Sequence, residues 1–323
     1  MIQYKSDVEA SDSLKLKHDA LLTEIEKVVF GQREIIEQVL TVMFAGGHCL
    51  LVGVPGLAKT LLVNTIAKAL DLKYKRIQFT PDLMPSDITG SEILDENKQF
   101  KFVKGPVFAN IILADEINRT PPKTQSALLE AMQEHTVTVS GNNYKLEEPF
   151  FVLATQNPVE QEGTYPLPEA QLDRFMFNVI LDYPSLEDEI TIVKNTTKDI
   201  IVETQKVVSA EEILYFRELI KRAPVADNVI KYAVSLVAKT RPKTQNSDAL
   251  ADKYLNWGAG PRASQYLITG AKTYALLHGK YSPDIDDVKA VALPVLRHRI
   301  IRNYQAEAEG LTEDDLIKKM LIE

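Results

Sequence analysis

The sequence predicts an α/β fold with a parallel sheet, followed by a smaller all-α domain. Short apolar runs at residues 49–52, 110–115 and 150–155 alternate with longer stretches whose apolar residues recur at helical spacing. Beyond residue 184 the strand-like runs thin out and helical patterns take over. We therefore expect a sheet domain at residues 1–184 and a helical domain at residues 185–323.

Composition excludes several classes of protein. Hydrophobic residues make up 45% of the chain and charged residues 25%, as in soluble globular proteins, and no apolar run approaches the roughly 18 residues of a membrane span. The N-terminus lacks the apolar segment of a secretory signal, so we expect a cytoplasmic protein without direct membrane insertion. The one cysteine, Cys49, reads as a buried structural thiol, and a net charge of −8 argues against nucleic acid as a partner.

The N-terminal part reads as a helical lead-in. Residues 1–16 are mixed and polar, which predicts a loose arm or a first helix turn. From residue 21 an apolar helical pattern continues to residue 46, with a break at residues 30–32.

Residues 53–60, GVPGLAKT, have the order of a phosphate-binding P-loop, because they lie between a strand and a helix. Backbone amides and the helix N-terminus would face the phosphates, with Lys59 on the terminal phosphates and Thr60 on magnesium. Ala58 stands where the general pattern has a second glycine, so an ordinary turn is the alternative. The predicted nucleotide-binding residues are Gly53, Val54, Pro55, Gly56, Leu57, Ala58, Lys59, Thr60 and Leu61.

The helix break at residues 30–32, ahead of this loop, has two possible interpretations. Val29, Gly31 and Gln32 either fold over the base of the nucleotide or form a plain helix-turn-helix lead-in.

After the loop helix, residues 76–80 predict a strand that Pro81 ends. Two pairs of short extended runs, at 91–104 around the turn 95–98 and at 136–146 around Ser140-Gly-Asn-Asn, predict inserted hairpins.

Asp115 and Glu116 follow an apolar run, which places both carboxylates at the carboxyl end of a buried strand, where open α/β sheets bind ligands. Asp115 would hold magnesium through water, and Glu116 would polarise a water molecule that attacks the γ-phosphate. An acidic strand end facing solvent is the alternative.

The strand at 150–155 brings Asn157 to the same edge, where it orients water or senses the γ-phosphate, or else forms an Asn-Pro turn. A proline-bearing loop at 160–169 follows. Arg174 opens the last predicted strand, and either pairs with Asp173 or projects toward another subunit.

In the helical domain, Ser282 and Pro283 predict a helix start. Near the other end of that helix four basic residues predict surface charge that suits the helix dipole: Arg297, His298, Arg299 and Arg302. The five histidines have no metal-ligand spacing.

Taken in order, GVPGLAKT, ILADEINR, ATQNP, LPEAQLDRF and GAGPRA resemble the MoxR family of AAA+ ATPases, a helix-2-insert clade, over about residues 24–310. The family pattern itself has alanine at the position of Ala58. The resemblance implies an αβα P-loop domain, a helical lid, and ATP held between subunits of a ring that is usually hexameric.

The resemblance also implies roles for single residues. Asn157 matches the sensor-1 residue, Arg262 in GPRA the sensor-2 residue that reaches the phosphates from the lid, and Arg174 the arginine finger acting on a neighbour's ATP. Arg119 is a second candidate for the finger. The two hairpins match the helix-2 and pre-sensor-1 insertions, which would face the pore or a partner.

The activity implied is hydrolysis of ATP with magnesium, catalysed by Lys59, Glu116, Asn157, Arg174 and Arg262. The leading hypothesis for its use is a chaperone-like motor that matures or activates protein clients, metal-cofactor insertion included, with a von Willebrand A domain partner. A magnesium-chelatase ATPase subunit and a nucleic-acid remodelling motor are the alternatives.

Overall fold

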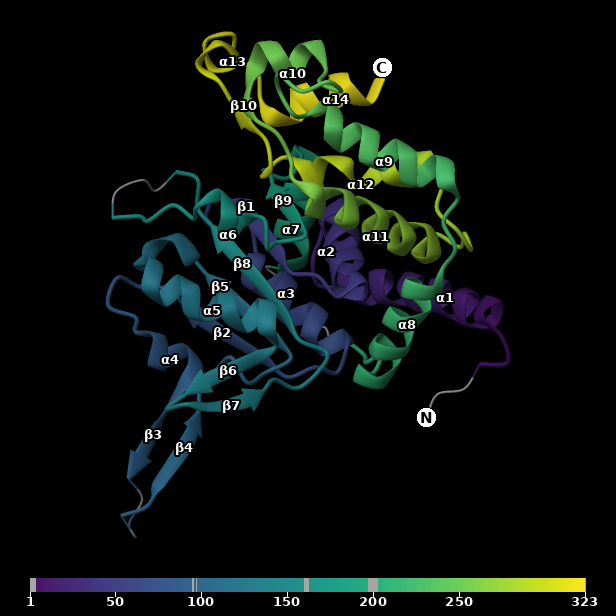
Figure 1. Cartoon of the computed structure of the whole chain (residues 1–323). Coiled ribbons are helices and arrows are strands. Elements are labelled where there is room, and N and C mark those ends of the chain that lie inside the picture. The colour runs from purple at the N-terminus through teal and green to yellow at the C-terminus, as the bar shows by residue number, and fades with distance from the viewer. Residues whose placement is uncertain (1–3, 95, 97, 160–162, 197–202, 323) are drawn as a thin grey trace.

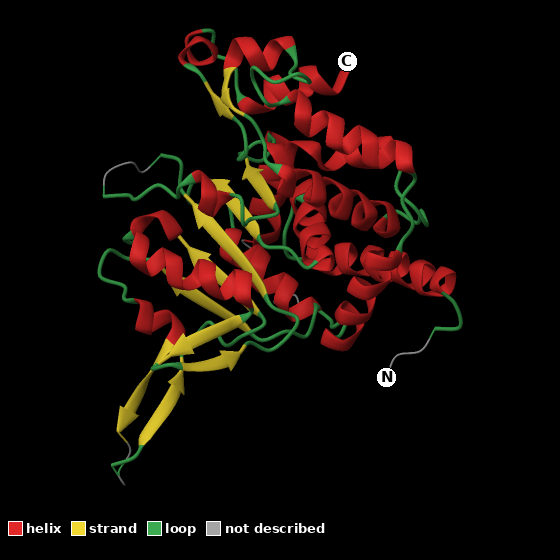
Figure 2. Ribbon diagram, in the orientation of Figure 1, coloured by secondary structure: helices red, strands yellow, loops and turns green. Residues whose placement is uncertain are grey.

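The computed structural model describes residues 4–94, 96, 98–159, 163–196 and 203–322, and a five-stranded parallel sheet forms its centre (Figures 1 and 2). The strand order is β2-β5-β8-β1-β9. The strands are β1 (Cys49–Gly53), β2 (Tyr74–Gln78), β5 (Ile111–Asp115), β8 (Phe151–Gln156) and β9 (Phe177–Leu181). Of the residues discussed above, the turn residues Asp95 and Asn97 and the loop residues 160–162 lie outside the described part.

The strand predictions are confirmed with small shifts in their bounds. The strand expected at 76–80 runs from Tyr74 to Gln78. The strand expected to open at Arg174 begins instead at Phe177, because the amide of Arg174 donates to the carbonyl of Gln171 in a turn, 3.2 Å away. Arg174 therefore lies just before the strand.

Helices cover both faces of the sheet because alternate strand residues face opposite sides. Ile111 and Leu113 join one buried cluster, whereas Ile112 and Ala114 join the other. Cys49 is buried in the first cluster, and burial raises the pKa of its thiol, as expected of a structural cysteine. The helices of this part are α1 (Asp7–Glu26), α2 (Arg33–Ala45), α3 (Lys59–Ala69), α4 (Pro85–Thr89), the 3-10 turn η1 (Ile117–Arg119), α5 (Pro122–Glu134) and α6 (Glu169–Leu172).

Both predicted hairpins are present. The first pairs β3 (Gly90–Leu94) with β4 (Phe100–Lys104) and projects away from the sheet (Figure 1). The second pairs β6 (Thr136–Val139) with β7 (Asn142–Lys145) through a two-residue turn in which Ser140 and Gly141 both have positive φ. The rings of Phe102 and Tyr144 stack with centroids 4.0 Å apart, so the hairpins contact each other at their base.

The expectation of a loose arm at residues 1–16 is wrong for the described residues, since α1 already begins at Asp7. The hydroxyl of Ser6 accepts from the amide of Glu9 and caps the helix. Ala10, Leu14 and His18 are buried along one face. The polar residues Ser11 and His18 are also buried on this helix, so its apolar pattern is weak in the sequence.

The C-terminal part is helical with one short strand pair, β10 (Leu255–Trp257) with β11 (Ile301–Arg302), that the sequence does not predict. One buried cluster runs from the sheet into these helices, so a division at residue 184 stays a prediction. No helix in the described residues is long and apolar enough to span a membrane. The helices are α7 (Leu186–Thr196), α8 (Ala210–Arg222), α9 (Asp227–Lys239), α10 (Ala249–Tyr254), α11 (Pro261–Leu277), α12 (Ile285–Leu296), α13 (Tyr304–Ala308) and α14 (Glu313–Ile322).

Two details at the ends of α12 correct the sequence analysis. The helix is capped by Asp284, whose carboxylate accepts from the amides of Asp286 and Asp287, and not by Ser282. At the other end the basic residues are not plain surface charge. His298 and Arg299 are only 9% and 6% exposed, because the chain leaves α12 against the segment that precedes β9.

Burial lowers the pKa of three histidines, His18, His48 and His298, which makes the stability of the fold depend on pH. Burial lowers the pKa of His18 and of His48 from 6.5 to about 4. His48 is held by the amide of Val152 at Nδ1 and the carbonyl of Met132 at Nε2, each 3.0 Å away. As the pH falls below 6.5, the unfolded chain takes up protons that the folded chain refuses until about pH 4.

We predict that the free energy of unfolding decreases between pH 6.5 and pH 4, by up to about 3 kcal/mol for each of His18 and His48. Urea denaturation followed at several pH values measures this. His18→Phe removes one of these groups and should make the pH dependence in this window less steep. An unchanged slope in the variant would contradict the assignment.

Candidate functional site

The loop from β1 to α3 is shaped to surround phosphates. Gly56 has φ +90° and Ala58 has φ +55°, so two left-handed residues curve the backbone before α3 begins at Lys59. A Cβ at Gly53 would lie 2.8 Å from the carbonyl oxygen of Leu181, so only glycine fits there. The first amides of α3 have no partner within the helix and are available to an anion.

Lys59 is the cation of this loop. Its ammonium donates to the carbonyl of Gly53 at 2.6 Å. Burial lowers the pKa of Lys59, while the charges of Asp115 and Glu116 raise it. The lysine is therefore electrostatically coupled to both acidic residues at the end of β5.

The other predicted residues of the loop differ in exposure. Val54 is half-buried, Leu57 is buried, and Pro55, Thr60 and Leu61 are exposed. The hydroxyl of Thr60 thus stands free to take a ligand.

The lead-in residues are brought against this loop. The side-chain amide of Gln32 donates to the carbonyl of Leu57 at 3.1 Å, and Val29 is buried. Gly31 has φ +70°, and a Cβ there would lie 2.7 Å from Asp188 of α7. The break between α1 and α2 therefore lies beside the P-loop, as a base-binding role requires, and the role itself stays a prediction.

Asp115 is held on both of its carboxylate oxygens. Arg76 donates to Oδ2 from Nε and Nη2, at 3.0 and 2.6 Å, and the hydroxyl of Thr155 donates to Oδ1 at 2.6 Å. The same hydroxyl accepts from the amide of Glu116 at 2.9 Å. Thr155 on β8 therefore fixes both acidic residues of the neighbouring strand.

The backbone of Glu116 is strained, and polar neighbours hold its side chain. Its φ is +57°, in the left-handed region that is costly for a residue with a side chain. Its Oε2 accepts from the side-chain Nε2 of Gln78 at 2.8 Å and from Nη1 of Arg119 at 3.0 Å. Arg119 thus contacts the carboxylate of its own chain.

Asn157 follows β8 and is 6% exposed. Its Oδ1 accepts from the amide of Val159 at 3.1 Å, which is the Asn-Pro turn considered from the sequence. The turn leaves the side-chain nitrogen as the donor that a phosphate or water would use. The Asn-Pro turn and the predicted contact with water or the γ-phosphate are therefore compatible.

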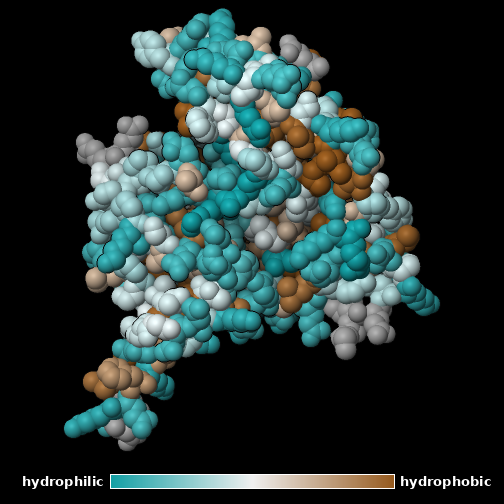
Figure 3. Space-filling model, viewed as in Figure 1, coloured by the Kyte–Doolittle hydropathy of each residue, from teal (hydrophilic) through white to brown (hydrophobic). Residues whose placement is uncertain are grey.

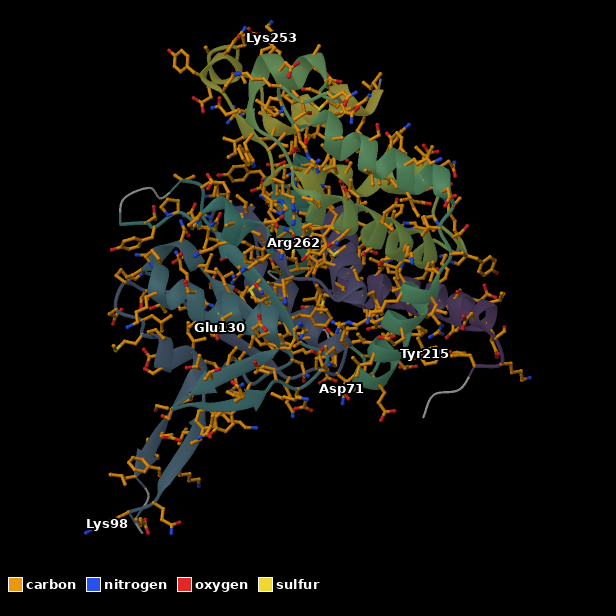
Figure 4. All side chains as sticks on the ribbon, viewed as in Figure 1. Asp71, Lys98, Glu130, Tyr215, Lys253 and Arg262 are labelled. Carbon is orange, nitrogen blue, oxygen red and sulfur yellow. The ribbon has the colours of Figure 1, made fainter. Side chains whose placement is uncertain are left out.

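Arg174 and Arg262 lie at the opposite edge of the sheet. Both line a cavity of about 230 Å³ together with Gly46, Gly47 and His48, which precede β1. The P-loop follows the carboxyl end of the same strand, so the length of β1, about 13 Å, separates the arginines from it. Figure 4 shows Arg262 where the helical part meets the sheet domain.

The two arginines differ in their partners. Arg262 forms an ion pair with Asp173, with 3.1 Å between Nη1 and Oδ2. Within the described residues the guanidinium of Arg174 has no hydrogen-bond or ion-pair partner, and it does not pair with Asp173. No acidic residue lines the cavity that both face. This edge therefore presents positive charge to an anion from outside the chain.

Three residues with direct contacts to the predicted site escaped sequence reasoning: Arg76, Gln78 and Thr155. Asp173 was considered only as a partner of Arg174, whereas it binds Arg262 and Arg299. Arg76 lies in the middle of β2 and Gln78 at its end, and this strand neighbours β5. Their side chains alternate with buried Ile77, and polar residues at a strand's carboxyl end were the available signal.

The donors at the P-loop edge fit magnesium. The Thr60 hydroxyl and the Asp115 carboxylate are the hard oxygen ligands that this ion prefers. In the described residues no group of three or more histidine, cysteine or acidic side chains is placed to hold a metal. Magnesium here would accordingly depend on the phosphates of the nucleotide for the rest of its ligands.

Comparisons with known proteins agree with this geometry. Residues 48–177 match a family model described as ATPase family associated with various cellular activities (AAA), and residues 247–320 match an AAA lid domain. The chain is 42% identical to the YeaC protein of Bacillus subtilis over 92% of this chain and 91% of that one. It is 40% identical to Chaperone MoxR1 of Mycobacterium tuberculosis over 92% and 79%. The crystal structure of a presumed ATPase from Cytophaga hutchinsonii superposes with a TM-score of 0.90, at 46% identity over 97% and 96%.

We predict that Thr155→Val lowers the rate of nucleotide hydrolysis at least tenfold. The substitution keeps the shape of the side chain but leaves the Asp115 carboxylate and the Glu116 amide without their shared partner, a loss of about 2 kcal/mol. Thr155→Ser, which retains the hydroxyl, is the matched control. Equal turnover by the valine and serine variants would show that the hydroxyl does not position the acidic residues.

Proposed function

The chain belongs to the MoxR family of AAA+ ATPases and therefore hydrolyses ATP, and we propose that it does so at the subunit interfaces of a hexameric ring, as a chaperone-like motor. The observation that carries this proposal is the division of the charged groups between two edges of the sheet. Lys59, Asp115 and Glu116 lie at the edge formed by the carboxyl ends of β1 and β5, whereas Arg174 lies at the other edge and lines a cavity there. In a ring, each interface is heterologous, which means that it joins two different surfaces of neighbouring subunits. The P-loop edge of one subunit can therefore meet the arginine edge of the next.

In this proposal one chain binds the nucleotide. The amides of the P-loop and Lys59 neutralise the phosphates, and Asn157 donates to the γ-phosphate. Thr60 and Asp115 would hold magnesium, which supplies further charge neutralisation when bound. Glu116 orients a water molecule toward the γ-phosphorus, the bond to the β–γ bridging oxygen breaks, and ADP and phosphate are the products.

The next chain completes the site. Arg174 would neutralise the charge that develops on the γ-phosphoryl group, with Arg262 beside it. The free guanidinium of Arg174 supports its choice as the finger over Arg119, whose guanidinium binds Glu116 of its own chain. Arg262 also requires a neighbour's phosphates, because the P-loop of its own chain lies at the far edge.

Exposed apolar side chains on the projecting hairpin support an interaction with protein clients. The projecting hairpin carries exposed apolar side chains, at 48% for Ile93, 61% for Leu94 and 75% for Phe100. Figure 3 shows an apolar patch on this projecting arm. Exposed apolar groups of this kind mark contacts with other proteins. A relative bears the name chaperone. We propose cytoplasmic clients that are matured or activated, metal-cofactor insertion included, with a von Willebrand A domain partner.

Mixed rings test the shared site. Glu116→Gln should bind ATP with an unchanged Kd but lose turnover, and Arg174→Ala should do the same when assembled. Mixing the two should restore about one quarter of the wild-type rate, because one interface in four joins an intact P-loop edge to an intact arginine edge. A mixture as inactive as its parts, with mixed assembly verified, would refute the shared site.

Affinity capture tests the role in the cell. Glu116→Gln holds ATP without turnover and should retain partners when purified from its native host. Lys59→Ala, which loses a phosphate contact, is the control. We expect a von Willebrand A domain protein in the first sample at several times its level in the second, by mass spectrometry. Its absence from both samples would contradict this partner.

A further inference from the structure

Arg299 is a buried arginine outside the P-loop edge, at the end of α12. It is 6% exposed, and the face of Tyr266 lies 5.0 Å from its guanidinium carbon. A fully buried arginine needs acceptors for its five N–H groups. Here those acceptors come mostly from one short segment of the chain that precedes β9.

The acceptors lie in residues 173–176, which precede β9. Nε donates to the carboxylate of Asp173 at 2.7 Å, and Nη2 donates to the carbonyls of Asp173 and Phe175 at 2.9 and 2.7 Å. Nη1 donates to the carbonyl of Met176 at 3.3 Å and to that of Val295 at 2.5 Å. The backbone on either side of Arg174 is therefore bound by a side chain of the helical part.

Asp173 links this anchor to the second arginine of the edge. Its Oδ1 binds Arg299, while its Oδ2 lies 3.1 Å from Nη1 of Arg262 on α11. One carboxylate thus joins Arg262 to the segment that carries Arg174. Tyr266 follows Arg262 by one helical turn on α11 and contacts the same guanidinium of Arg299.

We propose that Arg299 and Asp173 are positioning residues, which hold Arg174 and Arg262 as one fixed pair toward the neighbouring subunit's nucleotide. The proposal rests on the shared site described above. Hydrolysis in one subunit then depends on how the helical part of the next subunit is seated on its own sheet domain. Movement of α11 and α12 displaces both arginines together.

Stability alone does not account for the ion pair between Asp173 and Arg262. The side chains of Asp173 and Arg262 are 31% and 42% exposed, and ion pairs at such positions add little to folding. A displacement of about 1 Å in a catalytic group, in contrast, costs roughly 100-fold in rate. We therefore attribute the ion pair between Asp173 and Arg262 to the positioning of the arginine charge.

The first test is Asp173→Asn, which keeps the size of the side chain and removes the charge that both arginines share. We expect kcat of the assembled protein to fall at least tenfold while KM for ATP changes less than twofold. Arg302→Gln breaks an ion pair with Glu313 inside the helical part and should leave both constants unchanged. A wild-type kcat for Asp173→Asn would overturn the proposal.

Mixed rings separate positioning from a general defect. Asp173→Asn should be rescued by Glu116→Gln, whose arginine edge is intact, but not by Arg174→Ala, which is damaged at the same edge. Rescue by Arg174→Ala would overturn the positioning role. Failure of the Glu116→Gln and Arg174→Ala mixture would instead refute the shared site, and the positioning role with it.

Arg299→Lys is the second variant, for the case in which Asp173→Asn does not assemble. A single ammonium cannot contact four carbonyls and a carboxylate, so the same loss of kcat and the same pattern of rescue are expected. Normal kcat in the assembled Arg299→Lys protein would overturn the proposal. Circular dichroism and sedimentation confirm that each variant folds and assembles.

Discussion

The direction of the parallel strands is the constraint on which the rest of the structure depends. All carboxyl ends meet at one edge, so the P-loop, Asp115, Glu116 and Asn157 gather there from separate strands. Residues that precede a strand lie at the other edge, and Arg174 is one of them. Under the proposed function, the two sets act on one phosphate group where two copies of the chain meet.

Within each edge, buried hydrogen bonds fix charged side chains that would otherwise be mobile. Thr155 joins the two acidic residues at the P-loop edge. In the positioning role proposed above, Asp173 and Arg299 do the equivalent at the arginine edge, with the helical part supplying the anchor. Preorganised charge of this kind stabilises a transition state because no further reorganisation is needed during the reaction. The P-loop edge is built within the sheet domain, whereas the arginine edge depends on how two parts of the chain pack.

Much of this could be predicted from the sequence, because the strands and the P-loop rest on local patterns. Local sequence patterns located all five strands of the sheet, together with Asp115, Glu116 and Asn157. Contacts between distant segments could not be read in this way. Arg299 sits in a basic run at a helix end and reads as surface charge until the packing of α12 on residues 173–176 is known. The full length of α1 was not predicted either, because two of its buried positions, Ser11 and His18, are polar and weaken the apolar pattern.

The position of Arg262 at the arginine edge could not be predicted from the sequence for the same reason. Its motif suggests a phosphate contact, but only the packing of α11 shows that it lies with Arg174 and away from the P-loop of its own chain. The sequence predicts the chemistry of such a residue. The tertiary structure decides whose nucleotide it can reach.

The dependence of ATP hydrolysis on protein concentration tests the central claim most directly. If the site is shared, turnover per subunit is near zero where sedimentation shows monomers, and rises steeply as rings assemble. A turnover per subunit that stays constant across the assembly range would show that one chain carries a complete site, and would contradict the account.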